Sequence, residues 1–237
     1  MVSLDVGCVL VTGALGQIGT ELVAELQQRY GGGKVVATDI REPGGGFQGS
    51  FERLDVLDRE SLGRLVKEYD VGTIYHLAAI LSASGEKKPE LAWRVNVDGL
   101  CNVLDVAREH GVKRVFHPSS IAVFGPETPR ENTPEHTVLR PRTIHGVSKV
   151  VGELLGLYYF EKWGVDVRGI RFPGVISSEA PPGGGTTDYT VEMFYAAVRG
   201  EHYTCFLRED SRLPMIYMPD CLKFMRLLMD ASSDRLV

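Results

Sequence analysis

The chain has 237 residues, 43% of them hydrophobic and 24% charged, which is an ordinary composition for a globular protein with one sizeable core. Its 26 basic and 31 acidic residues give a net charge of −5, and it has no basic run that could hold a nucleic-acid backbone. With no charged leader and no run of the ~18 to 20 apolar residues that a bilayer span needs, we expect a cytoplasmic protein that binds neither nucleic acid nor membranes.

The first half of the chain alternates predicted strands with predicted helices. Residues 6–12 form a continuous apolar run that ends at glycine, which is typical of a strand buried on both faces of a parallel sheet. A helix follows, which three glycines at 31–33 end. The later expected elements are strands near 34–38, 51–55, 73–77 and 113–118 and helices near 58–68 and 89–109.

The second half begins with a helix whose apolar residues recur at helical spacing from Val147 to Tyr158, and a strand at 165–171 follows. After Pro173 the chain becomes rich in glycine and proline. We expect a helix at 191–199, a short strand at 204–207 and a last helix at 219–230. This order predicts an α/β fold with a doubly wound parallel sheet of six or seven strands, a Rossmann domain over 1–175 and a small substrate-side lobe over 176–237.

A glycine-rich turn joins the first strand to the first helix. Gly13, Gly16 and Gly19 have G-x-x-G-x-x-G spacing, and glycines at this place allow a pyrophosphate to approach a helix N-terminus. The bare pattern is also compatible with a tight turn that has no ligand. Asp39, at the end of the second strand, can accept hydrogen bonds from an adenosine ribose and would repel a 2′-phosphate, which favours NAD over NADP. Arg41 weakens this preference, because an arginine can accommodate that phosphate.

These motifs resemble the extended, epimerase-like branch of the short-chain dehydrogenase/reductase family. That family catalyses with a serine or threonine and a Y-x-x-x-K motif, in which the lysine lowers the pKa of the tyrosine one helical turn away. The resemblance implies that Ser120 stabilises the alkoxide and that Lys149 is the motif lysine. Four residues before Lys149 this chain has His145 in place of tyrosine.

The histidine at 145 predicts a weakened enzyme. An imidazole reaches roughly 2 Å less far than a phenol, and a misplacement of ~1 Å can cost on the order of 10²-fold in rate. Lys149 would also disfavour the imidazolium form. An engineered or mutated tyrosine site explains His145 better than a native mechanism built on histidine.

The family resemblance implies further residues on the cofactor side. Asp55 and Val56 would frame the adenine, Ala78 and Ala79 would pass the phosphates and ribose, and Asn96 would keep a helix locally open. The whole predicted NAD-binding set is Gly13, Gly16, Gln17, Ile18, Gly19, Asp39, Ile40, Arg41, Asp55, Val56, Leu77, Ala78, Ala79, Asn96, Lys149, Pro173 and Val175. No metal site is expected, since the four cysteines lack C-x-x-C spacing.

Segments outside the cofactor motifs, such as 77–86, 182–189 and 212–215, resemble the short-chain type of L-threonine 3-dehydrogenases. The resemblance implies oxidation of the C3 hydroxyl of L-threonine to 2-amino-3-oxobutanoate and a homodimer formed through two helices. One helix carries Leu100 and Leu104, and the other carries Leu154 and Leu155. The implied substrate-binding residues are Ser82, Ser119, Ser120, Gly184 and Thr186.

Two other readings stay open. A nucleotide-sugar epimerase or dehydratase would share the cofactor half and the serine–lysine set, although such enzymes need more C-terminal chain. A catalytically silent NAD-binding protein would explain His145. The family usually extends well beyond 237 residues, and the sequence leaves open whether the C-terminal lobe is truncated.

Overall fold

The computed structural model describes residues 7–181 and 183–235, so residue 6 of the first predicted strand and residue 182 of the glycine-rich segment lie outside the described residues. The core is a six-stranded sheet in the order β3-β2-β1-β4-β5-β7, and all its strand pairs are parallel. This confirms the predicted doubly wound sheet. Its strands are β1 (Cys8–Thr12), β2 (Val35–Asp39), β3 (Ser50–Arg53), β4 (Val71–His76), β5 (Arg114–Phe116) and β7 (Asp166–Arg168).

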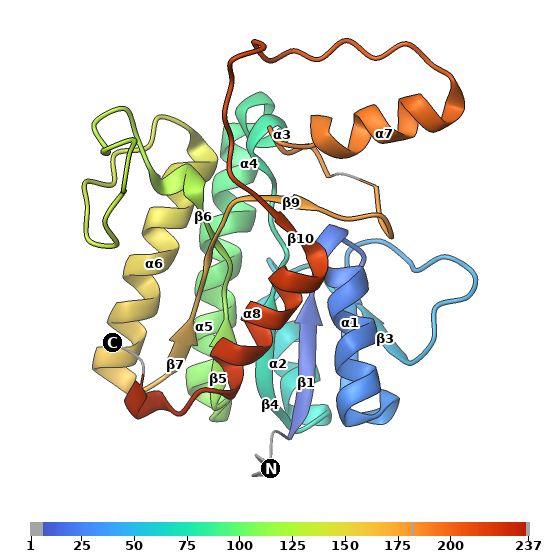
Figure 1. Ribbon diagram of the computed structural model, residues 1–237. Coiled ribbons are helices and arrows are strands. Elements are labelled where there is room, and N and C mark those ends of the chain that lie inside the picture. The colour runs from blue at the N-terminus through green and yellow to red at the C-terminus, as the bar shows by residue number, and fades with distance from the viewer. Residues whose placement is uncertain (1–6, 182, 236–237) are drawn as a thin grey trace.

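Helices cover both faces of this sheet (Figure 1), which is why the central strands β1 and β2 are buried along their whole length. Along β1, Val9 and Val11 pack against α1 (Gln17–Tyr30) and α8 (Met218–Asp230). Leu10, which points to the other face, joins a cluster built with α2, α5 and α6. Those three helices are Arg59–Glu68, Gly99–His110 and Ile144–Trp163.

The strand order reverses beside β1, which lies between β2 and β4. Such a switch point opens a crevice at the carboxyl ends of the strands, and ligands of this fold class bind there. In Figure 1, α3 (Ser82–Lys87), α4 (Pro89–Trp93) and α7 (Tyr189–Arg199) lie at this end of the sheet.

Two small parallel sheets add to this end of the molecule. In one, β6 (Ser119–Ser120) pairs with β8 (Arg171–Phe172), so the predicted strand at 165–171 is divided between β7 and β8. In the other, β9 (Gly174–Ile176) pairs with β10 (Met215–Tyr217).

The prediction of a strand at 204–207 is wrong, because those residues form no strand. The strand of this region lies at Met215–Tyr217 instead. The Gly174 amide donates to the Pro214 carbonyl at 3.1 Å at the start of the β9–β10 pair. A short apolar run becomes a strand only where a neighbouring edge supplies hydrogen bonds, and β9 offers its edge to 215–217.

The long helix predicted at 89–109 is interrupted. A π-helical turn at Arg94–Asp98 separates α4 from α5, and Asn96 lies within it. Among the described residues, no helix combines the length and the apolar character needed to cross a bilayer.

Candidate active site

The turn between β1 and α1 forms a cradle of exposed backbone. Gly13 has a φ of 68°, and a Cβ there would lie 2.6 Å from the Ala78 amide nitrogen. Gly19 packs on Ala14, whose Cα and carbonyl carbon would lie 2.8 Å from an added Cβ. No side chain caps the start of α1 at Gly16, so the first amides of this helix are left for an anion. The cradle therefore fits a pyrophosphate.

Asp39 stands at the end of β2, beside this cradle. Its carboxylate accepts the amides of Leu15 and Arg41, both at 3.1 Å, and pairs with the Arg41 guanidinium at 3.1 Å. Burial raises the pKa of this carboxyl, but the hydrogen bonds from Arg41 and Leu15 outweigh it and lower the pKa below the ordinary value. Asp39 is therefore an ionised acceptor whose charge and place at the end of β2 are compatible with the predicted ribose contact, and Arg41 covers part of it.

The other predicted cofactor residues lie along the same edge of the sheet. Ile40 follows β2 and is 60% exposed. Asp55 follows β3 and accepts the Leu57 amide at 2.9 Å, while the neighbouring Val56 is buried. Three residues that follow β4 lie close to the β1 end, with the Leu77 amide donating to the Thr12 carbonyl. The ends of β1 to β4 therefore lie along one edge of the sheet. The three residues that follow β4 are Leu77, Ala78 and Ala79.

Gln17 connects the cofactor turn to the predicted nicotinamide side. Its side-chain amide donates to the Val175 carbonyl at 3.2 Å, across 158 positions of sequence. Ile18 packs partly buried in the same core cluster as Val175, and Pro173 directly precedes β9. The β1–α1 turn and β9 therefore border one crevice.

The predicted catalytic residues come from β6 and the first turns of α6. Thr143 caps this helix by accepting the Gly146 amide at 3.1 Å. The Lys149 ammonium donates to the Pro118 carbonyl at 2.7 Å, directly before β6. Ser120, at the end of β6, accepts the Ala122 amide at 3.1 Å. Strand and helix are thus joined where both carry predicted reactive groups.

Burial sets the charge states of Lys149 and His145. Desolvation lowers the pKa of Lys149 to about 8, because this ammonium lies in the protein interior. Desolvation, followed by the repulsion of Lys149, lowers the pKa of His145 to about 4. His145 Nδ1 lies 3.3 Å from the Ile80 carbonyl, which can only accept, so the proton is on Nδ1. At neutral pH the imidazole is uncharged and its free lone pair is on Nε2.

Asn96 holds the backbone of Ile80, the residue that His145 contacts. Its side chain accepts the Ile80 amide at 2.8 Å and donates to the Ile80 carbonyl at 3.0 Å. It also donates to the Ser148 hydroxyl at 3.2 Å. The π-helical turn places this side chain between the two segments, so the predicted local opening of the helix is present.

The predicted substrate residues of the glycine-rich segment meet the start of α3. The Thr186 amide donates to the Ser82 hydroxyl at 3.1 Å, and the Gly184 carbonyl accepts the Ala83 amide at 3.1 Å. Asp188 closes the turn by accepting the amides of Gly184 at 2.8 Å and Gly185 at 2.7 Å. Burial is the main reason that the pKa of Asp188 is raised.

Three side chains near these groups were not singled out from the sequence. Asp188 orders the Gly184 turn, and Glu153 with Arg171 contacts Ser119. Glu153 follows Lys149 by four residues, so helical spacing alone could have placed it on the same face of α6. No comparable signal marks Arg171, because its contacts come from segments distant in sequence.

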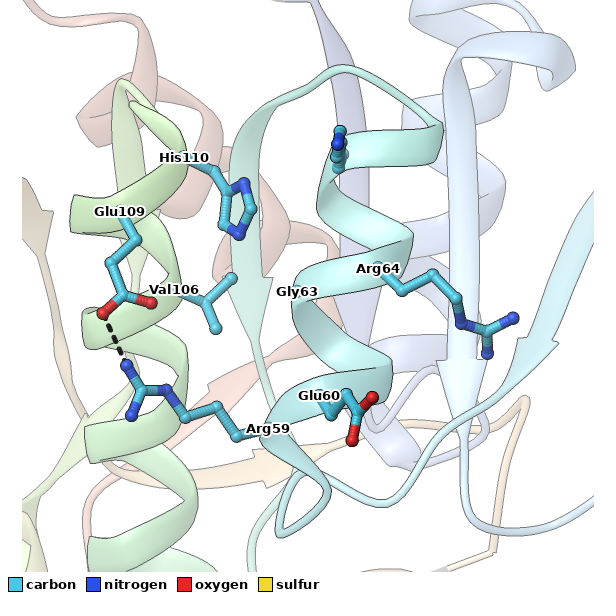
Figure 2. A pocket seen from close by; sticks show the side chains of 8 residues that line it. Arg59, Glu60, Gly63, Arg64, Val106, Glu109 and His110 are labelled. Atoms are coloured by element: carbon cyan, nitrogen blue, oxygen red, sulfur yellow. Dashed lines mark hydrogen bonds and ion pairs between the residues drawn. The ribbon is translucent and has the colours of Figure 1, made fainter.

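A hollow of about 500 Å³ lies elsewhere, between α2 and α5 (Figure 2). Arg59 of α2 donates to Glu109 of α5 at 2.6 Å there, and Arg64 points away from α5. Charges of both signs line this open hollow, and none of the predicted site residues belongs to it. We therefore place the candidate active site at the carboxyl ends of the strands.

Known proteins are similar to this chain over nearly its whole length. A model of the NAD dependent epimerase/dehydratase family matches residues 9–236. An uncharacterized epimerase/dehydratase of Staphylococcus haemolyticus is 49% identical over 232 residues, which cover 97% of this chain and 73% of that protein.

Two solved structures are similar over nearly the whole chain. An L-threonine dehydrogenase from Phytophthora infestans is 54% identical with a TM-score of 0.92, over 96% of this chain and 73% of that one. The enzyme of that name from Clostridium difficile is 47% identical with a TM-score of 0.94, over 99% and 74%. The glycine cradle and Asp39 are compatible with NAD, the cofactor of the family whose model matches. This chain belongs to the NAD dependent epimerase/dehydratase family.

Proposed function

We propose that the chain oxidises the C3 hydroxyl of L-threonine to 2-amino-3-oxobutanoate with NAD as the oxidant, at a rate that His145 reduces. The observation that carries this proposal is the similarity to solved L-threonine dehydrogenases at 47% and 54% identity. The contact between Ser82 and Thr186 supports it, since a small zwitterion needs short hydroxyl and backbone partners.

Each predicted site residue has one role in the proposed reaction. Ser82, Gly184 and Thr186 hold the amino acid, and Ser120 donates a hydrogen bond to the alkoxide that develops at C3. His145 stands where the family has its tyrosine but is too short and too weakly basic to accept the hydroxyl proton efficiently, so that proton leaves mainly to solvent. The Lys149 ammonium stabilises negative charge nearby. The glycine cradle and Asp39 would hold NAD, which would supply the acceptor for the hydride from C3.

The electrostatics of His145 support a reduced rate. A general base works best when its pKa lies near the working pH. Burial and Lys149 lower the pKa of His145 to about 4, so it is a weak base at neutral pH as well as a short one. The second candidate function, an NAD-binding protein without turnover, is favoured by this same observation.

The test is NADH formation by the His145→Tyr protein with L-threonine, UDP-sugars and simple 2-hydroxy acids as separate substrates. We expect activity with L-threonine. Activity confined to UDP-sugars would refute the threonine assignment in favour of a nucleotide-sugar enzyme. Cofactor binding with no turnover of any substrate would favour the silent NAD-binding protein.

We also propose a homodimer whose interface is formed by α6 and not, as expected from the sequence, by the apolar residues of α5. The predicted α5 residues Leu100 and Leu104 are buried in the chain's own core. The apolar face that is left exposed belongs to α6, where Leu154, Leu157 and Phe160 are 62%, 55% and 51% exposed. A contiguous apolar helix face of this kind is typical of an interface.

A further inference from the structure

Two consecutive residues of the serine-bearing segment are bound by two consecutive turns of α6. The Pro118 carbonyl accepts from Lys149 at 2.7 Å, and the Ser119 hydroxyl donates to Glu153 at 2.5 Å. Lys149 and Glu153 are four residues apart and lie on one face of the helix. The second contact thus ties the strand that carries Ser120 to the helix that carries the predicted base.

Arg171 also holds Glu153, and its Nε donates to Oε1, the same oxygen that Ser119 contacts. Its guanidinium donates to both carboxylate oxygens, each at 2.8 Å, in the bidentate geometry that restricts a carboxylate most. Arg171 is also the register partner of Ser119 in the β6–β8 pair. A further hydrogen bond to the Glu135 carbonyl at 3.1 Å and the ring of Phe124 at 5.6 Å fix the guanidinium in turn.

The Glu153 carboxylate is ionised within this network. Burial raises its pKa, but the hydrogen bonds from Arg171 and Ser119 outweigh that effect and lower the pKa below the ordinary value. With side-chain exposures of 26% for Glu153 and 20% for Arg171, the pair is half-buried rather than a solvated surface contact. Such a charged network of hydrogen bonds resists displacement of Ser119 and of the residue that follows it.

We propose that Glu153 is a positioning residue: clamped by Arg171, it fixes β6 so that the Ser120 hydroxyl keeps its place relative to Lys149 and residue 145. Catalytic groups must be held to within about 0.5 Å of their working geometry, and a ~1 Å error can cost on the order of 10²-fold in rate. This inference rests on the proposed function for the choice of substrate.

The test uses the His145→Tyr protein as the parent, with Glu153→Gln and Ser119→Ala added singly and together. Ser119→Ala removes the hydroxyl that contacts Glu153, and Glu153→Gln removes the negative charge and one of the two oxygens that accept from Arg171. Ser119→Ala also leaves the Glu153–Arg171 pair intact if Glu153→Gln fails to fold. We expect kcat with L-threonine to fall about 10-fold or more in each single variant, while the NADH dissociation constant changes less than about 2-fold. KM should also change less than about 2-fold in Glu153→Gln, because Glu153 is not among the predicted substrate contacts.

Because the two side chains act through one contact, the double variant should be no slower than the slower single variant. Glu109→Gln is the matched control, since it also removes a carboxylate from an arginine, in the exposed pair of Figure 2. Its kcat should equal that of the parent. Losses that multiply in the double variant, or single variants that match Glu109→Gln, would overturn the proposal.

A crystal structure of the Ser119→Ala protein gives a second readout that does not depend on turnover. We expect Ser120 to move relative to Lys149 by more than about 0.5 Å, which is the tolerance of a catalytic geometry. An unmoved Ser120 would refute the positioning role. If the parent does not oxidise L-threonine, the proposed function fails while this structural comparison still decides the role of Glu153.

Discussion

At the scale of single residues, His145 is the most consequential side chain of the site. We expect His145→Tyr to raise kcat by on the order of 10² or more and to change NADH affinity less than about 2-fold, because the cradle and Asp39 are untouched. His145→Phe should differ little from the unsubstituted protein. Steady-state kinetics and fluorescence titration measure both quantities. Equal turnover of the His145 and His145→Tyr proteins would show that histidine is a competent base.

Asp39 should decide between the two nicotinamide cofactors. Its ionised carboxylate accepts from a ribose diol and repels a 2′-phosphate, so we expect NADH to bind more tightly than NADPH by 10-fold or more. Asp39→Asn should remove most of this difference. Arg41→Ala is the control, since it keeps the carboxylate and removes the guanidinium that pairs with it. Comparable dissociation constants in the unsubstituted protein would contradict the assignment.

At the scale of elements, the β1–α1 turn requires glycine at 13 for two reasons, which a matched pair of variants separates. Gly13 and Gly111 have φ values of 68° and 70°, but a Cβ at Gly111 would meet nothing within 4 Å. We expect Gly111→Ala to cost about 1–2 kcal/mol from backbone strain alone. Gly13→Ala adds overpacking of about 1–3 kcal/mol against Ala78, for about 2–5 kcal/mol in all.

Chemical denaturation measures these free energies of unfolding. NADH titration of the two variants should show binding retained in Gly111→Ala and lost in Gly13→Ala, since the added methyl would force the β1–α1 turn away from the Ala78 backbone that borders the cradle. Equal effects of the two substitutions would mean that the turn is an ordinary tight turn without a ligand.

The exposed face of α6 should mediate dimer formation. We expect a dimeric mass at micromolar concentration and a monomeric mass after Leu154→Lys with Leu157→Lys, because each leucine withdrawn from an interface costs about 1.5–3 kcal/mol. Val198→Lys on α7 is the control: Val198 is 88% exposed but belongs to a different face. Light scattering measures the mass. A monomer before any substitution would refute the proposed interface.

At the scale of the whole molecule, three buried histidines should make the fold sensitive to mild acid. Burial lowers the pKa of His76 to about 3, that of His117 well below its ordinary value and that of His145 to about 4. Among the described residues, His76 Nε2 and both nitrogens of His117 have no hydrogen-bond partner. Between pH 6.5 and about 4 the unfolded chain therefore binds more protons than the folded one.

The contribution of these histidines to the free energy of unfolding is fully present above pH 6.5. It decreases as the pH falls toward 4, by up to ~1.4 kcal/mol per pH unit for each histidine. Urea unfolding at pH 7.5, 6 and 5 measures this slope. His117→Leu should reduce it by about one third, while His202→Leu, at an exposed position, should not. Carboxylates with lowered pKa values, such as Asp39, lose their contribution only at lower pH. A slope that His117→Leu leaves unchanged would contradict this assignment.

The sequence by itself determined the features that depend on neighbouring residues. The apolar run of β1 and the glycines after it predict a buried strand that opens a helix over a phosphate site, and the structure has both the strand and the cradle. Local spacing also placed His145 and Lys149 one turn apart on α6. The roles of these residues toward cofactor and substrate remain predictions.

Only the tertiary structure decided features that arise between distant segments. The π-helical turn around Asn96 exists because its side chain bonds to Ile80 and Ser148, 16 and 52 positions away. The strand of this region is β10 and not the expected 204–207, because only residues 215–217 lie beside the edge of β9 and can pair with it. The proton position on His145 and the clamp of Arg171 on Glu153 likewise come from contacts that no local pattern encodes, since hydrogen bonds and desolvation depend on which groups the fold brings together.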